Sequence, residues 1–134
     1  GRLKRGKKLN FHFDRDLSLS RETGESVFPM LSSVYYLNQY DSSPTVLLDQ
    51  LPGEDGKSKV PEQVKMSTSV MAIPNHYVVF PGNLRHGVIP DTRKLDRDDP
   101  GECRLTLLVN YWDRRPAAPV CCDFDGTVYR SLCE

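Results

Sequence analysis

The sequence predicts an all-β domain, either a β-sandwich or a barrel. Short runs rich in β-branched and aromatic residues alternate with turn signals, and they amount to about seven or eight strands. No stretch has convincing helical periodicity. At 134 residues, the chain is long enough for one domain with a sizeable core.

The predicted strands are separated by polar segments and by segments that contain Pro or Gly. In chain order the strands cover residues 9–14, 30–38, 45–51, 64–73, 76–80, 86–89 and 104–112. Loops or turns are expected over residues 17–26, 41–44, 52–63, 81–83 and 90–101. Near the end of the chain, Asp125–Gly126 predicts a hairpin turn.

Composition points to no particular class of partner. Basic and acidic residues balance at 18 each, so the net charge indicates neither a nucleic acid nor a membrane surface as partner. The apolar runs are too short to span a bilayer, and no apolar signal segment opens the chain. A soluble, cytoplasmic location is favoured, although composition does not fix the compartment or the oligomeric state.

Two further features bear on domain organisation. Residues 1–8 carry five basic side chains and are interpreted as a solvated tail or linker, which leaves residues 9–134 as the domain. The four cysteines show no metal-finger spacing, so both a disulfide and free thiols remain open; they are Cys103, Cys121, Cys122 and Cys133.

The segment Leu9–Asp14 alternates apolar and polar residues, as a strand does. His12 and Asp14 are therefore expected on one face, with Phe11 and Phe13 packed on the other. An imidazole beside a carboxylate supplies two of the three ligands of an iron site with two histidines and one carboxylate. Because a His-x-Asp pair also arises by chance, the interpretation depends on a third ligand.

The candidates for the third ligand are His76 and His86, and periodicity alone does not decide between them. We favour His86 because Gly87 beside it lets the backbone pass close to a metal and to whatever the metal binds. His76 begins a predicted strand directly after Asn75, and it is interpreted as a surface histidine.

The predicted strand 104–112 places Arg104, Thr106, Leu108 and Asn110 on one face. An arginine on the inward face of a β-domain is costly unless it meets an anion, and its planar fork suits a carboxylate. Thr106 offers one more hydrogen bond to the same group. On an edge strand, Arg104 would instead lie in solvent.

Taken together, these features resemble the Fe(II)- and 2-oxoglutarate-dependent oxygenases, with the prolyl-4-hydroxylase-like group as the nearest branch. The resemblance runs from about Asn10 to Trp112, and the combination in this order is specific although no single element is. Its elements are His12-x-Asp14, Tyr35-Tyr36-Leu37-Asn38, His86-Gly87-Val88 and Arg104-x-Thr106.

The resemblance implies a double-stranded β-helix, the jelly-roll or cupin-like barrel, with residues 9–134 as the catalytic core. It implies Fe(II) held by His12, Asp14 and His86, with O2 and 2-oxoglutarate as co-substrates and ascorbate as a candidate reductant. The residues that it assigns to 2-oxoglutarate are Arg104, Tyr36 and, as a weaker contact, Thr106. The implied reaction is hydroxylation of an unidentified substrate, for which a protein or peptide side chain is a candidate, with release of succinate and CO2.

The sequence departs from the family pattern in three places. Ser43–Pro44 stands where most members have a Gly-Gly pair, which puts the shape of that turn in doubt. The spacing from His86 to Arg104 is longer than in compact members, which is consistent with an inserted charged loop over residues 91–102. The supporting elements that most members carry before the His-x-Asp strand have no counterpart here, so the substrate side is expected to be incomplete.

Two other classes of protein remain open. A cupin-like metal protein without oxidative chemistry would use His12, Asp14 and His86 but would give Arg104 and Tyr36 no joint role. Lack of 2-oxoglutarate binding would favour it. A non-catalytic β-sandwich interaction module would make the histidines coincidental, and absence of metal binding would favour that reading.

Overall fold

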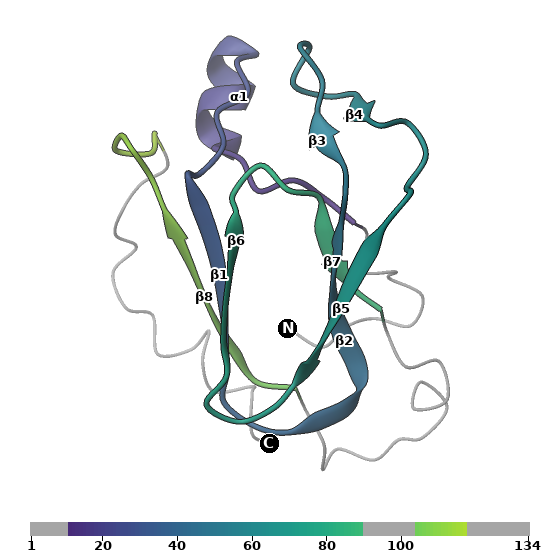
Figure 1. Cartoon of the computed structure of the whole chain (residues 1–134). Coiled ribbons are helices and arrows are strands. Elements are labelled where there is room, and N and C mark those ends of the chain that lie inside the picture. Colours follow the sequence, from purple (N-terminus) through teal and green to yellow (C-terminus); the bar gives the residue numbers. More distant parts are fainter. Residues whose placement is uncertain (1–10, 90–103, 118–134) are drawn as a thin grey trace, which may run out of the picture.

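Two small antiparallel sheets that face each other form the body of the molecule (Figure 1). The computed structural model describes residues 11–89 and 104–117, and these residues form eight strands and one short helix. The predicted all-β class is therefore confirmed. Among the described residues, no helix combines the length and the apolarity needed to cross a bilayer.

The first sheet has the order β6-β1-β8, the second has the order β5-β2-β7, and β3 and β4 form a separate two-stranded ribbon. The helix α1 spans Leu17–Thr23. The strands are β1 (Leu31–Tyr36), β2 (Tyr40–Leu48), β3 (Leu51–Pro52), β4 (Lys59–Val60), β5 (Ser67–Ala72), β6 (Tyr77–Pro81), β7 (His86–Val88) and β8 (Thr106–Tyr111).

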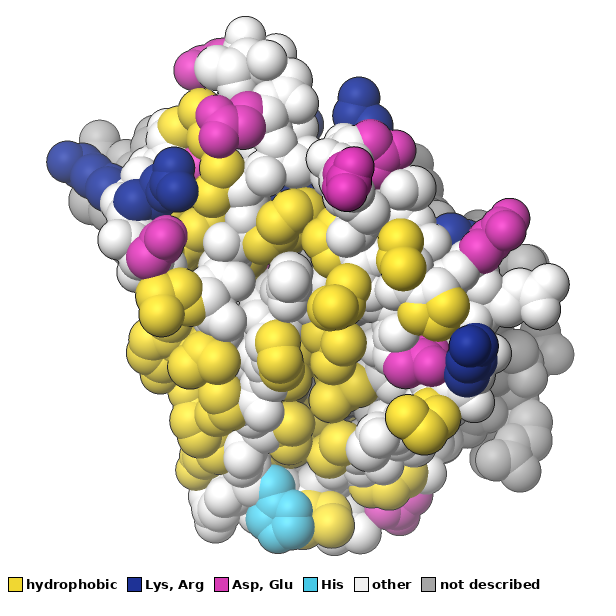
Figure 2. Space-filling view, turned by 45° about the horizontal axis from the view of Figure 1, so that its top comes forward, with side chains coloured by type: hydrophobic (Ala, Val, Ile, Leu, Met, Phe, Trp, Pro, Cys, Tyr) yellow, Lys and Arg dark blue, Asp and Glu magenta, His cyan; other side chains and the backbone are white. Residues whose placement is uncertain are grey.

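The central strand β1 separates an inward and an outward face of the first sheet. Ser32, Val34 and Tyr36 alternate along it and are buried towards the second sheet. On the other face, Tyr35 lies opposite Tyr77 of β6 and Leu107 of β8. Tyr77 and Leu107 are about half exposed, so the outward face is apolar but open. Figure 2 shows hydrophobic side chains gathered over the lower left and centre of the face in view.

The core lies between the two sheets. Val34, Tyr36, Phe80 and Ala72 are buried and in contact with one another, and Leu47 of β2 packs against them. The first three come from the first sheet and the last two from the second. Burying a large apolar side chain stabilises a fold by about 1.5–3 kcal/mol, so this cluster holds the sheets together.

The predicted turn over residues 41–44 is wrong, because β2 already begins at Tyr40. The register between β2 and β5 shifts between Tyr40 and Thr45, so the strand is irregular there. Pro44 lies in this irregular part, where a proline is tolerated within a sheet. The predicted loop 52–63 likewise contains the end of β3 and all of β4.

The prediction that the chain lacks helix is also wrong, because residues 17–23 form α1. Asp16 caps its first turn by accepting a hydrogen bond of 3.0 Å from the Leu19 backbone. Gly24 ends the helix in the left-handed conformation. The helix buries none of its side chains, so it lacks the apolar stripe by which helices are predicted.

The expected strand over residues 9–14 is reduced to a single bridge between His12 and His86 in the described part of the chain. Phe13 is buried, as the alternation predicted. The remaining predicted strands correspond to β1, β5, β6, β7 and β8 with ends shifted by a few residues. The hairpin at Asp125–Gly126, the basic segment 1–8, the charged loop and the cysteines lie outside the described residues.

Candidate metal centre and adjoining cavity

His12 and His86 form a reciprocal backbone pair, although 74 positions separate them in the sequence. The His12 N–H donates to the His86 carbonyl at 2.9 Å, and the His86 N–H donates to the His12 carbonyl at 3.0 Å. In an antiparallel pair, two residues that exchange hydrogen bonds in this way project their side chains to the same face. The backbone therefore brings the two imidazoles together, with ring centroids 4.6 Å apart.

Gly87 permits this close pairing. A Cβ added at Gly87 would lie 3.0 Å from a ring carbon of Phe11 and 3.2 Å from the Phe11 backbone. A side chain at position 87 would therefore require Phe11, which belongs to the segment that carries His12 and Asp14, to move by at least a few tenths of an ångström. The sequence had suggested a close approach at Gly87, but the group that approaches it is Phe11.

Asp14 completes a group of three candidate ligands whose ligand atoms all lie within 4.8 Å of one another. Its Oδ1 atom lies 3.3 Å from Nε2 of His12 and 3.6 Å from Nε2 of His86. Side-chain exposure is 57% for His12, 19% for Asp14 and 11% for His86. The group is thus open to solvent on the His12 side and enclosed on the His86 side.

The surroundings favour the forms of Asp14 and His86 that bind metals. Burial disfavours the ionised form of Asp14, but hydrogen bonds from His12 and Ser32 and the nearby imidazoles together hold its pKa below the usual value. Burial lowers the pKa of His86, although the Leu84 carbonyl and Asp14 act in the opposite direction. At neutral pH, a carboxylate therefore faces a neutral imidazole.

The hydrogen-bond partner of His86 determines which of its nitrogens carries the hydrogen. Nδ1 lies 2.9 Å from the Leu84 carbonyl oxygen, which can only accept a hydrogen bond. In the neutral imidazole the hydrogen is thus on Nδ1, and Nε2 holds a lone pair. That lone pair lies 3.6 Å from the ionised Oδ1 of Asp14 with no hydrogen between the two atoms.

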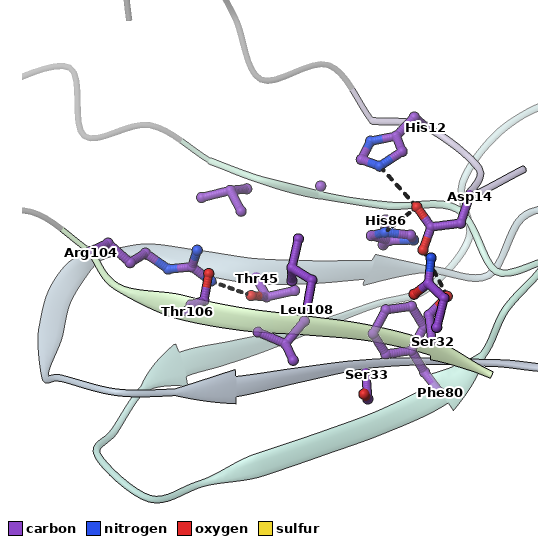
Figure 3. A pocket seen from close by; sticks show the side chains of 14 residues that line it. His12, Asp14, Ser32, Ser33, Thr45, Phe80, His86, Arg104, Thr106 and Leu108 are labelled. Atoms are coloured by element: carbon purple, nitrogen blue, oxygen red, sulfur yellow. Dashed lines mark hydrogen bonds and ion pairs between the residues drawn. The ribbon is translucent and has the colours of Figure 1, made fainter. Parts of the chain in front are cut away.

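A cavity of about 310 Å³ opens beside the three ligands and runs between the two sheets. Figure 3 shows His12, Asp14 and His86 at one end, Arg104 and Thr106 at the other, and Leu108 between them. β8 and the residues just before it contribute four side chains to the cavity wall, which are Arg104, Thr106, Leu108 and Asn110. The predicted inward face of this strand is therefore the face that lines the cavity.

At the far end of the cavity, Thr45 joins Arg104 to the core. The guanidinium of Arg104 donates to Oγ1 of Thr45 at 2.6 Å, and the buried Tyr36 hydroxyl donates to the same atom at 2.8 Å. The Nε atom of Arg104 is buried without a hydrogen-bond partner among the described residues. Arg104 thus keeps an unsatisfied donor beside the cavity.

The structure brings together some of the predicted site residues and separates others. His86 joins His12 and Asp14, whereas His76 lies exposed next to β6 and away from the group. Tyr36 is fully buried and is not among the residues that line the cavity, but its hydroxyl donates to Thr45 and the guanidinium of Arg104 lies 5.3 Å from the centre of its ring.

Two residues whose hydroxyl groups bond to predicted site residues were not themselves predicted. Thr45 lies at the Arg104 end, and Ser32 donates a hydrogen bond of 2.7 Å to Oδ2 of Asp14. The only sequence signal for either residue was strand alternation, which gives Ser32 the same face as Val34 and Tyr36.

No known family model matches the chain, and no curated protein or solved structure matches it. The assignment of a function therefore depends on the geometry of the three candidate ligands and of the cavity beside them.

Proposed function

We propose that this protein is an Fe(II)- and 2-oxoglutarate-dependent dioxygenase of the prolyl-4-hydroxylase-like type, built on a double-stranded β-helix. It would hydroxylate an as yet unidentified substrate and release succinate and CO2. Two facing antiparallel sheets with the strand orders β6-β1-β8 and β5-β2-β7 support the jelly-roll assignment.

The observation that carries the proposal is the contact between Asp14 and His86. A carboxylate oxygen and an imidazole lone pair lie 3.6 Å apart, and the hydrogen that would link them is held at Leu84 instead. Two acceptors at this distance repel each other unless a cation lies between or beside them. Nε2 of His12, 3.3 Å from the same oxygen, would supply the third ligand once the hydrogen that it donates to Asp14 has moved to Nδ1.

The residue types fit Fe(II). Two imidazoles and one carboxylate, with further positions left open, are the usual ligand set of non-haem Fe(II) oxygenases. Fe(II), when bound there, would supply the activation of O2 and the oxidative decarboxylation of 2-oxoglutarate. The Leu84 carbonyl fixes the tautomer of His86, so the protein presents Nε2 ready to bind.

Arg104 and Thr45 support the assignment of 2-oxoglutarate to the rest of the cavity. Arg104 offers an unsatisfied buried donor. Thr45 already accepts two hydrogen bonds, so its own hydroxyl hydrogen is left to donate to a carboxylate. Thr106 lies on the same wall of the cavity.

The spacing of the two ends suits a short dicarboxylate. On the second sheet, Thr45 pairs with Val88 and Leu47 pairs with His86. The two positions are thus separated by two residues along the strand, or about 7 Å at a rise of ~3.4 Å per residue. A five-carbon chain bridges this distance with one carboxylate near Thr45 and the other beside the metal ligands.

The remaining wall of the cavity supports an uncharged substrate group. Leu108 and Asn110 line the cavity and are exposed to it. Once Asp14 holds the metal and Arg104 holds the co-substrate, the described lining presents no other acidic, lysine or arginine side chain. An aliphatic carbon next to an amide, as in a peptide, matches these contacts.

Succinate formation tests the proposal. We expect the purified chain, supplied with Fe(II), 2-oxoglutarate, ascorbate and O2, to form succinate in a slow turnover without substrate. Asp14→Ala should abolish this activity, and the exposed Asp113→Ala should retain it. A folded chain that binds metal but neither binds nor turns over 2-oxoglutarate would be a cupin-like metal protein. A folded chain that binds no metal would be an interaction module.

A further inference from the structure

The two oxygens of Asp14 have different neighbours. Oδ1 faces the Nε2 atoms of His12 and His86, at 3.3 and 3.6 Å. Oδ2 accepts the hydroxyl hydrogen of Ser32 at 2.7 Å (Figure 3). A hydrogen bond of this length to an ionised oxygen is among the stronger ones in proteins. The carboxylate is therefore held with one oxygen towards the histidines and the other tied to β1.

Ser32 is itself fixed in place. It lies on the inward face of β1, 2% exposed, and it pairs with Phe80 on one side and with Asn110 on the other. Its only hydroxyl hydrogen is the one that Asp14 accepts. Ser32 thus approaches Asp14 from a rigid, hydrogen-bonded strand rather than from a loop.

From this geometry we propose that Ser32 is a positioning residue of the metal centre. By tying Oδ2 to β1, it would orient Asp14 so that Oδ1 faces the metal, and this would leave the other metal positions for 2-oxoglutarate and O2. The inference rests on the proposed function, and it deepens that function by naming what keeps the coordination sphere open. Without Ser32, the carboxylate is free to rotate and to offer both oxygens.

The neighbouring Ser33 provides a matched control. It is as buried as Ser32, at 1% exposure, and its hydroxyl also donates one hydrogen bond of 2.7 Å, but to the Val109 carbonyl. Its side chain lies on the opposite face of β1, where it accepts a hydrogen bond from Tyr77. Ser33 also borders the cavity, but its hydroxyl bonds to Val109 and Tyr77, and of the two serines only Ser32 bonds to a proposed metal ligand.

The test compares Ser32→Ala with Ser33→Ala in the full chain. Fe(II) affinity is measured anaerobically without 2-oxoglutarate, and 2-oxoglutarate is then titrated into the Fe(II)-loaded protein. Removing a partner of a metal ligand typically costs 10–100-fold in metal affinity or activity. We expect Ser32→Ala to weaken Fe(II) or 2-oxoglutarate binding at least about 10-fold, and Ser33→Ala to leave both within about twofold of the parent chain.

Two more variants separate positioning from folding. Ser32→Thr keeps the hydroxyl and should restore both affinities. Ser32→Cys keeps the volume but donates a weaker hydrogen bond, so it should fall between the parent chain and Ser32→Ala. If Ser32→Ala does not fold, Ser32→Cys takes its place in the comparison with the parent chain.

The outcomes distinguish this inference from the proposed function. If Ser32→Ala or Ser32→Cys bound Fe(II) and 2-oxoglutarate as tightly as the parent chain, the role of Ser32 would be overturned but the proposed function would not. Equal losses in Ser32→Ala and Ser33→Ala would do the same, because they would indicate a general effect on the sheet. A parent chain that binds no Fe(II) would overturn the proposed function together with the inference.

Discussion

Arg104 and Thr45 are joined at the far end of the cavity by a hydrogen bond of 2.6 Å, although they are 59 positions apart in the sequence. Tyr36 donates to the same threonine oxygen from within the core, at 2.8 Å. The cation at the far end of the cavity is therefore held by a hydroxyl that is anchored in turn by a buried tyrosine. This chain of contacts gives the proposed anion site a rigid support.

Arg104→Ala should mainly weaken 2-oxoglutarate binding. A hydrogen bond to a charged group contributes about 1.5–3 kcal/mol, which corresponds to roughly 10- to 150-fold in affinity. Fe(II) affinity measured without 2-oxoglutarate should change little, because Arg104 is not among the three candidate ligands. Titration of the Fe(II)-loaded protein with 2-oxoglutarate checks this, with the exposed Arg114→Ala as control. Unchanged co-substrate affinity would mean that the anion site is elsewhere.

Thr45→Val should destabilise the fold even without any ligand. The substitution leaves the Tyr36 hydroxyl, which is fully buried, without its acceptor. An unsatisfied buried donor costs about 1–3 kcal/mol. Combining Thr45→Val with Tyr36→Phe removes both partners, so the double variant should be more stable than Thr45→Val alone. Chemical unfolding measures these free energies, and a double variant no more stable than Thr45→Val would contradict the contact.

Gln50→Leu should be among the more destabilising substitutions outside the apolar core. Gln50 is 1% exposed, donates to the carbonyls of Pro61 and Glu62, and accepts a hydrogen bond of 2.7 Å from Arg85. We expect a loss of about 1–3 kcal/mol in the free energy of unfolding. Gln39→Leu, at an exposed position, should change it by less than about 0.5 kcal/mol. Similar losses of unfolding free energy for both variants would show that the buried hydrogen bonds of Gln50 do not stabilise the fold.

Asp55 should make stability sensitive to acid. Hydrogen bonds from the backbone of Lys57 and Ser58 and from the Ser58 hydroxyl lower its pKa from 3.8 to about 2. A lowered folded-state pKa stabilises the fold at pH values above 3.8, and this contribution is lost as the pH falls towards 2. The difference in melting temperature between the parent chain and Asp55→Asn should therefore narrow between pH 5 and pH 3. A constant difference would refute this account of the loop.

Strand alternation predicted the parts of the site that depend on a single strand. It placed Arg104 and Thr106 on one face of the predicted strand 104–112, and both residues line the cavity. It also placed His12 and Asp14 on the same side, although only one bridge pair remains of the expected strand. Alternation depends only on an extended backbone, so it holds even where few residues pair with a neighbouring strand.

Contacts between residues far apart in the chain could not be predicted from local sequence patterns. Alternation puts Ser32 and Ser33 on opposite faces of the strand, but only the position of Asp14 beside Ser32 shows which serine contacts the site. Thr45 was not predicted for the same reason, and its hydrogen bond from the Tyr36 hydroxyl is known only from the structure. The short helix α1 was missed because its caps, Asp16 and Gly24, flank a segment without an apolar stripe.

An anaerobic titration with Fe(II) followed by 2-oxoglutarate tests the central claim most directly, because one visible absorption band requires both groups in the same cavity. We expect the metal-to-ligand charge-transfer band of the chelated complex in the parent chain and in His76→Ala. It should be absent in His86→Ala, which lacks a ligand. A folded chain that binds both Fe(II) and 2-oxoglutarate without producing the band, or a band that persists in His86→Ala, would contradict the assignment of this cavity.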